Sequence, residues 1–364
     1  MNGRVAVVGG GLAGFVGYLT LRRGGLEPEE ITVFAPEPDP AAAWRRRAAA
    51  IRQTHMRSES DGHCLPTSFP GLAVRETRRT RSLSPLVRSV CDRYHPTVDD
   101  FLQHVEELRV RSGWSARVRP ARIARVRAVD GGFELDEHGV LQHVLLATGH
   151  SGHAIPEELR GDSRVVHAYE PHDYADSVCV VGAGMAAATE WLNALSAGAT
   201  VISVRRREPV RRPLNVPRPY LSRRGLTAFH RLAAADRAAL LRELLAPSYP
   251  AGREWDEPLA QAAAEHRFKI ETAVNGADQV ICATGFLRGY RHDPLLRRLV
   301  EEHELETAAQ RIVLAPDSTV PALTDRTRTL ALAGVSAQWA YPAADTLMGA
   351  RYAAHAFVRR CRTR

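Results

Sequence analysis

Four short apolar runs divide the chain into a repeated pattern. They span Val5–Val8 and residues 143–150, 178–181 and 279–286. The first and third runs lead into glycine-rich turns, whereas the second and fourth contain Ala-Thr-Gly. Continuously apolar runs of this length are typical of parallel strands covered on both faces. The pattern therefore predicts an α/β fold with two Rossmann-like dinucleotide-binding domains.

The segments between these runs predict the other elements. Leu12–Arg23 can form a helix after the first turn, and residues 29–38 supply a strand that ends in a turn. Residues 95–110 read as a helix, with Pro96 and Thr97 placed to begin it and acidic residues near its positive end. We also expect helices within 41–57, over 226–245 (one helix or a pair) and from about Thr346.

Each small residue of a nucleotide-binding turn has its own steric role. In the first turn, Gly9 permits the tight bend, Gly11 lets backbone approach a pyrophosphate, and Gly14 lets the helix pack closely on the strand. The following N–H groups, from Leu12 and Ala13, face the phosphates. The second turn offers the corresponding set Gly182, Gly184, Met185, Ala186 and Ala187, with alanine as the permitted third residue. Two such turns predict two dinucleotide sites.

The strand after the second turn indicates which nucleotide binds there. Residues 199–209 carry Arg205, Arg206 and Arg207 where an NAD site would have a carboxylate. A guanidinium suits the 2′-phosphate of NADPH, because it forms charge-assisted bidentate hydrogen bonds. The alternative is a solvated run of arginines.

The ribose contact of the first site is less regular. Ala35 occupies the position where an acid is usual, so Glu37 or Asp39 would have to reach the ribose instead.

Composition narrows the possible functions. The 364 residues carry a net charge of +8, and nearly all of the basic residues are arginine, with Lys269 the only lysine. The arginines are scattered rather than gathered on one helix face, so we expect no nucleic-acid partner. No apolar segment approaches the ~18 residues of a membrane span, and Met1 is followed almost directly by a strand. We expect a cytoplasmic protein without a membrane partner.

The five cysteines are isolated from one another. Cys64, Cys91, Cys179, Cys282 and Cys361 form neither a Cys-x-x-Cys pair nor a metal-ligand spacing. This argues for a reducing compartment, against a dithiol reductase and against a metal site.

Two dinucleotide sites in one chain favour a flavoprotein. NADPH leaves after each hydride transfer whereas FAD stays bound, so one site would hold FAD and the other would receive NADPH. The electrons would then pass to oxygen or to another acceptor. Three functions remain open: a monooxygenase, an NAD(P)H-dependent flavoprotein reductase, and a non-catalytic flavin-binding regulatory protein.

Two further stretches carry a more specific resemblance. His167 and Ala168 lie in a segment similar to the pattern Gly…Val-His-Ser-x-x-Tyr, with alanine at the serine position. The second Ala-Thr-Gly, between Asp278 and Phe286, is similar to Asp-x-x-x-(Leu/Phe)-Ala-Thr-Gly-Tyr. On these motifs and the two turns, the chain resembles flavin-dependent monooxygenases of the flavin-containing and N-hydroxylating group over most of its length.

The resemblance implies FAD in the first turn, NADPH in the second, and a set of site residues. The implied catalytic residues are Asn215, His167 and Gln53. The implied cofactor contacts beyond the turns are Glu37, Arg57, Ser58, Thr148, Gly149, Thr284, Gly285, Thr346 and Leu347. Alternatives are that His167 packs at the junction of the domains and that the two threonines satisfy local backbone.

The resemblance also implies a domain division and a reaction. We expect an FAD-binding domain from residues 1–165 and 290–364 and an inserted NADPH-binding domain from residues 166–289. The expected reaction oxygenates a small amine or amino-acid-like metabolite through a flavin hydroperoxide, as N-hydroxylation first and S-oxidation second. The expected partners are this small molecule and molecular oxygen, and the sequence predicts no oligomeric state.

Overall fold

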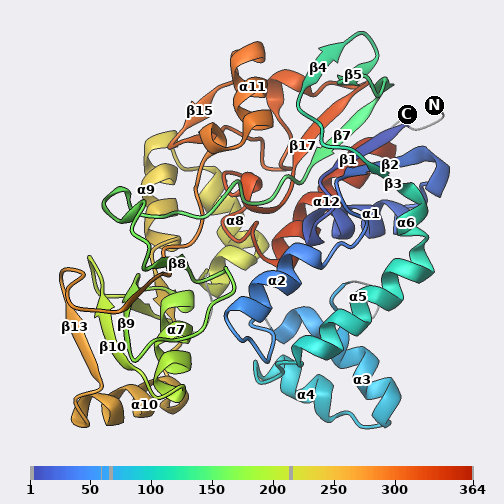
Figure 1. The fold of residues 1–364 in the computed structure, drawn as a ribbon. Coiled ribbons are helices and arrows are strands. Elements are labelled where there is room, and N and C mark those ends of the chain that lie inside the picture. The colour runs from blue at the N-terminus through green and yellow to red at the C-terminus, as the bar shows by residue number, and fades with distance from the viewer. Residues whose placement is uncertain (1–3, 59, 65–68, 213–215, 363–364) are drawn as a thin grey trace.

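The computed structural model describes residues 4–58, 60–64, 69–212 and 216–362, and these contain two separate five-stranded sheets (Figure 1). The strand order is β17-β7-β1-β2-β3 in the first sheet and β13-β10-β9-β14-β8 in the second. All neighbouring strands in both sheets run parallel. The predicted fold class, α/β with two Rossmann-like units, is confirmed.

The first sheet combines strands from both ends of the chain. Its strands are β1 (Val5–Val8), β2 (Ile31–Ala35), β3 (Val118–Pro120), β7 (His143–Leu146) and β17 (Thr329–Leu332). Helices α1 (Leu12–Arg23) and α12 (Leu347–Arg362) cover one face, where Phe15 and Phe357 pack with Val5 and Val7. The opposite face meets the antiparallel sheet of β4 (Val126–Val129), β5 (Gly132–Leu135) and β6 (Val140–Leu141). Both faces of this sheet are therefore buried.

A helical extension lies between β2 and β3. It contains α2 (Ala42–Ala50), α3 (Leu72–Thr80), α4 (Ser84–Val90), α5 (Val98–Ser112) and α6 (Trp114–Arg117). The predicted start of α5 is confirmed, because the Thr97 side chain accepts a hydrogen bond from the Asp100 amide as an N-cap.

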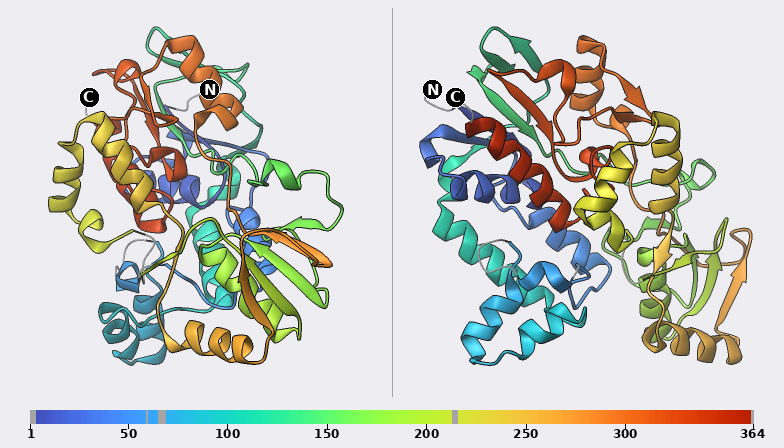
Figure 2. Two further views of the ribbon diagram at one scale, coloured as in Figure 1. Left: turned by 90° about the vertical axis from the view of Figure 1, so that its left-hand side faces the viewer. Right: turned by 180° about the vertical axis from the view of Figure 1, so that it is seen from behind.

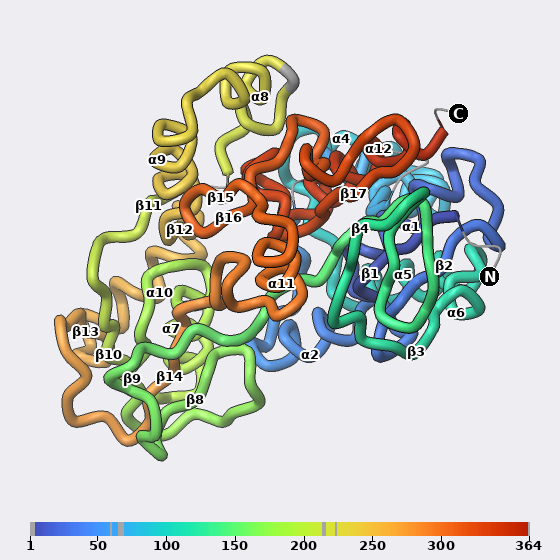
Figure 3. Tube along the Cα trace, turned by 90° about the horizontal axis from the view of Figure 1, so that it is seen from above, coloured from blue at the N-terminus to red at the C-terminus, as the bar shows by residue number. Residues whose placement is uncertain are grey.

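The second sheet is formed in the middle of the chain. Its strands are β8 (Val165–His167), β9 (Ser177–Val181), β10 (Thr200–Val204), β13 (Phe268–Glu271) and β14 (Gln279–Cys282). Helices α7 (Met185–Ser196) and α10 (Arg253–Ala264) cover one face, with Trp191 at 0% exposure among its apolar residues. The other face is covered by Leu159, at the end of a short 3₁₀ turn, and by loop residues such as Ala277. Figure 3 shows this unit beside the first sheet.

One helix pair crosses between the units. Helices α8 (Arg223–His230) and α9 (Ala234–Leu244) follow β11 (Val210–Arg211) and precede β12 (Ser248–Tyr249). Phe229 and Leu241 pack in the core of the first unit together with Trp339. Both views in Figure 2 show this yellow pair away from the second sheet. The pair thus belongs spatially to the first unit, although it lies within the range 166–289.

The chain then returns to the first unit. This return contains α11 (Pro294–His303), β15 (Thr307–Ala308), β16 (Arg311–Ile312) and the 3₁₀ helix η7 (Gly334–Ala337). Further 3₁₀ turns are η1 (Pro28–Glu30), η2 (Ser60–Cys64), η3 (Glu157–Leu159), η4 (Arg218–Leu221), η5 (Tyr290–His292) and η6 (Pro321–Leu323). None of the helices within the described ranges is both long and apolar enough to cross a membrane.

Candidate functional site

The first glycine turn joins β1 to α1 and is closed on two sides. Gly9 has φ +113°, and a Cβ there would collide with the carbonyl of Ala147. A Cβ on Gly14 would collide with the carbonyl of Gly9. At Gly11, by contrast, a Cβ would meet no atom within 4 Å. The turn is therefore open at the one position where a pyrophosphate would approach.

The second turn joins β9 to α7 in the same way. Gly182 has φ +143°, and a Cβ there would collide with the carbonyl of Ala283. A Cβ on Gly184 would have Pro247 as its nearest neighbour, 3.9 Å away. Ala187 at the third position is fully buried in the contact between helix and sheet. In both units, the first glycine thus faces the alanine carbonyl of the neighbouring Ala-Thr-Gly.

The residues of both turns fit a dinucleotide. Helices α1 and α7 begin at Gly11 and Gly184 without a side-chain cap, so their first-turn amides are available to an anion. Beside the first turn, the buried Thr148 hydroxyl has no hydrogen-bond partner within the described part of the chain. A buried hydroxyl without a partner is costly unless a ligand supplies one.

The backbone of Glu37 lies beside the first turn. A Cβ on Gly10 would lie 3.3 Å from the Glu37 carbonyl oxygen, and the Glu37 side chain is about half exposed, paired with Arg46 at 3.2 Å. Asp39 is used locally, because it accepts from the Ala41 amide at 2.9 Å and pairs with Arg45 at 2.8 Å. These contacts favour Glu37 over Asp39 as the ribose residue.

The arginines after β10 differ in availability. The Arg205 side chain is only 11% exposed and pairs with Glu208 at 3.0 Å. Arg206 is exposed and pairs with Glu158 at 3.0 Å. Arg207 is exposed and has no ion pair to any described residue. Arg206 and Arg207 are therefore the better placed pair for a phosphate arriving from solvent.

The two Ala-Thr-Gly loops pair with each other. The Ala154 amide donates to the Gly285 carbonyl at 3.0 Å, and the Leu287 amide donates to the Gly152 carbonyl at 2.9 Å. The Thr284 hydroxyl donates to the Ala154 carbonyl. The Thr284 hydroxyl thus bonds to backbone of the other loop rather than to its own segment, whereas the Thr148 hydroxyl has no partner among the described residues.

His167 joins β8 to the second of these loops. Its Nε2 lies 2.9 Å from the Gly285 carbonyl oxygen, and its Nδ1 accepts from the Tyr169 amide at 3.2 Å. The ring is fully buried and stacks on His153 with centroids 4.0 Å apart. Burial and the charge of His153 lower the pKa of His167 to about 4, so it is neutral at pH 7. These contacts favour the packing alternative for His167 over a catalytic role.

Helix α2 and the segment after it face the second unit. Arg47 stacks over Phe286 at 4.5 Å, Arg52 over Tyr174 at 4.5 Å, and Arg57 over Trp255 at 5.7 Å. Each of these contacts joins the first unit to the second and contributes about 0.5–1 kcal/mol where it is exposed. The predicted flavin-side residue Arg57 therefore lies at the junction of the units.

The other two predicted residues of this segment have local partners. Gln53 donates to the His55 carbonyl at 2.7 Å, and the Ser58 hydroxyl lies 3.0 Å from Nε2 of His63. Asn215, the third catalytic candidate, lies outside the described residues.

The start of α12 lies at the end of a tightly packed loop. Thr346 donates to the Ala343 carbonyl at 2.9 Å and accepts from the Gly349 amide at 3.1 Å, so its hydroxyl caps the helix ahead of Leu347. The preceding Asp345 has an exposed side chain.

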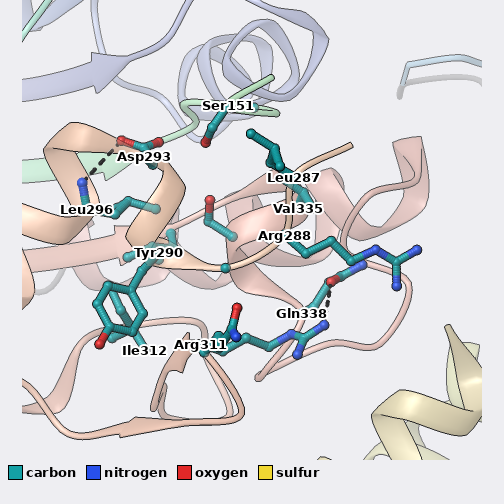
Figure 4. Close-up of a pocket in the computed structure, with 15 residues that line it drawn as sticks. Ser151, Leu287, Arg288, Tyr290, Asp293, Leu296, Arg311, Ile312, Val335 and Gln338 are labelled. Carbon is teal, nitrogen blue, oxygen red and sulfur yellow. Dashed lines mark hydrogen bonds between the residues drawn. The ribbon is translucent and has the colours of Figure 1, made fainter. Parts of the chain in front are cut away.

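A pocket that the sequence did not predict lies beside these loops (Figure 4). It is a small pocket of about 40 Å³ between the loops after β7 and β14, β16 and η7. Its polar lining includes Ser151, Arg288, Tyr290, Arg311 and Gln338. Among 49 basic residues, neither arginine stands out in the sequence, except that Arg288 closely follows the second Ala-Thr-Gly.

Comparisons with known proteins identify the fold. No protein-family model matches the chain, and neither does any curated protein sequence. An ornithine N-hydroxylase from Kutzneria sp. 744, solved with reduced FAD, NADP⁺ and L-ornithine, has a TM-score of 0.73 at 14% identity, covering 99% of each chain. An FAD-bound cadaverine monooxygenase from Erwinia amylovora has a TM-score of 0.71 at 12% identity, covering 100% of this chain and 95% of that one.

A reductase has a similar fold. The bacillithiol disulfide reductase of Bacillus cereus has a TM-score of 0.63 at 14% identity, covering 99% of each chain. The chain therefore has the fold of two-dinucleotide flavoproteins, N-hydroxylating monooxygenases among them.

Proposed function

We propose that this protein is an FAD- and NADPH-dependent monooxygenase that N-hydroxylates a small amine or amino-acid-like metabolite. The observation that carries the proposal is the pair of glycine turns on separate parallel sheets. Each turn is sterically closed at its first glycine and open at the glycine that begins the helix. Two nucleotide sites of this form fit a resident flavin cofactor and a visiting nicotinamide cofactor.

The first unit would hold FAD. Gly9, Gly11 and Gly14 would receive the pyrophosphate at the start of α1, with the free Thr148 hydroxyl beside them. Glu37 would bind the adenosine ribose. The start of α12, at Thr346 and Leu347, would approach the flavin ring.

The second unit would hold NADPH. Gly182 and Gly184 would receive its pyrophosphate at the start of α7, while Arg206 and Arg207 would bind the 2′-phosphate. When bound, the flavin would supply oxygen activation and NADPH the reducing hydride. The stacked pairs between the units, such as Arg47 on Phe286, would keep water away from the junction where the two cofactors meet.

The cysteines favour oxygen over a disulfide as the electron acceptor. All five are free, and Cys179, Cys282 and Cys361 are buried. Burial raises the pKa of Cys179 and Cys282 to about 11, so both remain thiols at pH 7. A disulfide reductase needs a reactive thiolate, which the buried Cys179 and Cys282 do not provide. The reductase remains the rival function because a disulfide reductase shares the fold.

The test is to measure products as well as NADPH consumption. Purified protein is loaded with FAD and supplied with NADPH, oxygen and either L-ornithine, L-lysine, putrescine or cadaverine. A monooxygenase consumes NADPH and oxygen in equal amounts and yields an amine product heavier by one oxygen atom, measured by mass spectrometry. NADPH consumption that needs a disulfide or dye and gives no oxygenated product would identify a reductase. A protein that retains no flavin would end the proposal.

A further inference from the structure

The short helix α4 exposes its apolar side chains. Leu83, directly before the helix, is 70% exposed, and Val87 and Val90 within it are 59% and 69% exposed. Their spacing places all three on one side of the helix. The other exposed large apolar residues of the described ranges lie singly on four different elements: Val110, Val140, Val210 and Ile270. Single exposed apolar residues are common on protein surfaces, whereas three on one side of a helix form a patch.

The opposite side of α4 is buried although it is partly polar. Ser89 is fully buried, donates to the Ser60 carbonyl and accepts from the Cys64 thiol at 3.1 Å. Pro85, one turn earlier, is buried on the same side. A surface helix normally buries its apolar side and exposes its polar side. Helix α4 has the reverse arrangement, so its packing on the first unit does not account for the three exposed apolar residues.

Arginines surround this apolar patch. Four of them are exposed and form no ion pair with any residue that the structure describes, namely Arg78, Arg79, Arg81 and Arg88. The first two end α3, the third follows it directly, and the fourth lies within α4. Arg81 has left-handed backbone with φ +53°, at a helix end where glycine or asparagine is usual. An arginine is thus kept at this turn despite an unfavourable backbone conformation.

The acids of the α3–α4 hairpin are used elsewhere. Glu76 accepts from the Tyr94 hydroxyl at 2.6 Å, and Asp92 pairs with Arg218 of η4 at 3.2 Å. The hairpin forms a projecting end of the molecule at the lower right of Figure 1. This end therefore presents apolar and positive side chains together, without a free carboxylate of its own.

We propose that the α3–α4 hairpin docks on an anionic lipid surface. Its apolar patch would enter the lipid interface while the arginines bind lipid phosphates, a combination typical of proteins that lie on such surfaces. A second copy of the chain fits less well, because a two-fold contact would bring the same arginines against each other. A helix of another protein would need a groove, which a projecting hairpin does not offer. The proposal revises the expectation of no membrane partner, which drew on the lack of a long apolar segment.

The experiment measures how the full chain binds to vesicles. Phosphatidylcholine vesicles with about 30% phosphatidylglycerol should bind the protein about tenfold more tightly than phosphatidylcholine alone, and salt should weaken this binding. Cys91, next to Val90, is exposed, whereas the other four cysteines are partly or fully buried. A polarity-sensitive fluorophore attached to Cys91 therefore reports whether the patch enters the lipid. We expect its emission to shift to the blue with anionic vesicles only.

Two variants test the two parts of the surface. Leu83→Gln/Val87→Gln/Val90→Gln removes the apolar patch, and Arg79→Gln/Arg81→Gln removes two of the charges. Each should weaken binding to the anionic vesicles about tenfold. The replaced side chains are exposed, so both variants should keep the fold, which circular dichroism checks. The single variant Leu83→Gln serves if the triple variant does not fold.

Matched controls separate the hairpin from the net charge of +8. Ile270→Gln removes an exposed apolar residue of β13, and Arg253→Gln/Arg297→Gln removes the same charge from α10 and α11. Both controls should bind as the unchanged protein does. Equal losses in the two arginine double variants would show that net charge alone attracts the protein, and would overturn the inference.

Two other results would also overturn it. One is a fluorophore at Cys91 whose emission does not change while the protein is bound to vesicles. The other is a dimer in analytical ultracentrifugation that the apolar triple variant abolishes, in a protein that binds no vesicles, which would assign the patch to a second copy. No measurement here uses turnover, so the result is independent of the proposed function.

Discussion

The two glycine turns have the same course but tolerate different changes. In the first, a Cβ at Gly9, Gly10 or Gly14 would collide with neighbouring backbone or a side chain. In the second, Gly182 is closed in the same way, but Gly184 has its nearest neighbour at 3.9 Å and the third position is already alanine. The first sheet is also covered by regular elements on both faces, whereas loops cover one face of the second. The more enclosed unit suits a cofactor that stays, and the more open unit suits one that leaves.

The largest expected effect is on folding, and it comes from changing the third small residue of each turn, which is Gly14 in the first and Ala187 in the second. Gly14→Val would drive its side chain into the Gly9 carbonyl, so α1 could not pack on β1. We expect this variant to lose folded, flavin-binding protein, measured by circular dichroism and the flavin-to-protein ratio. Ala187→Gly is the matched change in the second unit and costs only about 1 kcal/mol. Equal behaviour of the two variants would contradict the difference between the turns.

The second prediction assigns one cofactor to each turn. Gly11 and Gly184 have extended backbone and open space around the Cβ position, so Gly11→Ala and Gly184→Ala should both fold normally. The added methyl groups occupy the approach of a pyrophosphate. Gly11→Ala should weaken FAD binding about 100-fold with little effect on NADPH, and Gly184→Ala should do the reverse. Flavin fluorescence and NADPH titration measure the two affinities. If Gly11→Ala weakens NADPH binding and Gly184→Ala weakens FAD binding, the two cofactors occupy the opposite turns.

The third prediction compares buried histidines of the two sheets. His143 at the start of β7 is 2% exposed, neither ring nitrogen has a hydrogen-bond partner among the described residues, and burial lowers its pKa to about 4. His167 has the same lowered pKa, but both nitrogens are bonded. An imidazole that ionises near pH 6.5 when unfolded takes up its proton first in the unfolded state. Stability is therefore complete above pH 6.5 and falls towards pH 4, by about 2 kcal/mol per histidine at pH 5.

Urea unfolding at pH 7 and pH 5 tests the difference. His143→Leu should lose less unfolding free energy between pH 7 and pH 5 than the unchanged protein, and its stability at pH 7 should not fall. His167→Leu should destabilise the protein at pH 7, because the Tyr169 amide loses its acceptor and the Gly285 carbonyl keeps only the Ala154 amide as a donor. If His143→Leu loses as much unfolding free energy between pH 7 and pH 5 as the unchanged protein, His143 is not the cause of that loss.

The smallest predicted effect concerns nucleotide choice in the second unit. Arg206→Ala with Arg207→Ala should lower the preference for NADPH over NADH about tenfold, because charge-assisted bonds to the 2′-phosphate are lost. Arg205→Ala should change it less, since that guanidinium is largely buried on Glu208. The affinity ratio for the two nucleotides is the measurement. An unchanged ratio in the double variant would reject the 2′-phosphate site.

The parts that the sequence predicts are those whose causes are local. The glycine turns follow from steric demands within a few residues, and the start of α5 follows from the Thr97 cap. The short strand β8 was not predicted, because its three residues carry no clear period and gain their pairing only from β14. The antiparallel sheet β4–β5–β6 was missed for a similar reason.

Site residues follow the same rule. The tight turns at Gly9 and Gly182 could be predicted from their own segments, but the contact of His167 is with a carbonyl 118 residues away. The pocket with Arg288 and Arg311 is formed by segments that are far apart in the chain. No sequence pattern within a single segment therefore predicts it.

The paired Ala-Thr-Gly loops also govern how the protein can be taken apart. The chain leaves the first sheet beyond Gly152 and comes back at Leu287, and these two residues share a backbone hydrogen bond. Because Gly152 and Leu287 are so close, a short linker between them could in principle replace the residues in between. However, α8 and α9 lie within this stretch and supply Phe229 and Leu241 to the hydrophobic core of the first unit. Deleting the whole stretch would therefore expose that core. Removing the second sheet while keeping the helix pair would therefore take two separate excisions, because β8, β9 and β10 precede α8 whereas β13 and β14 follow α9.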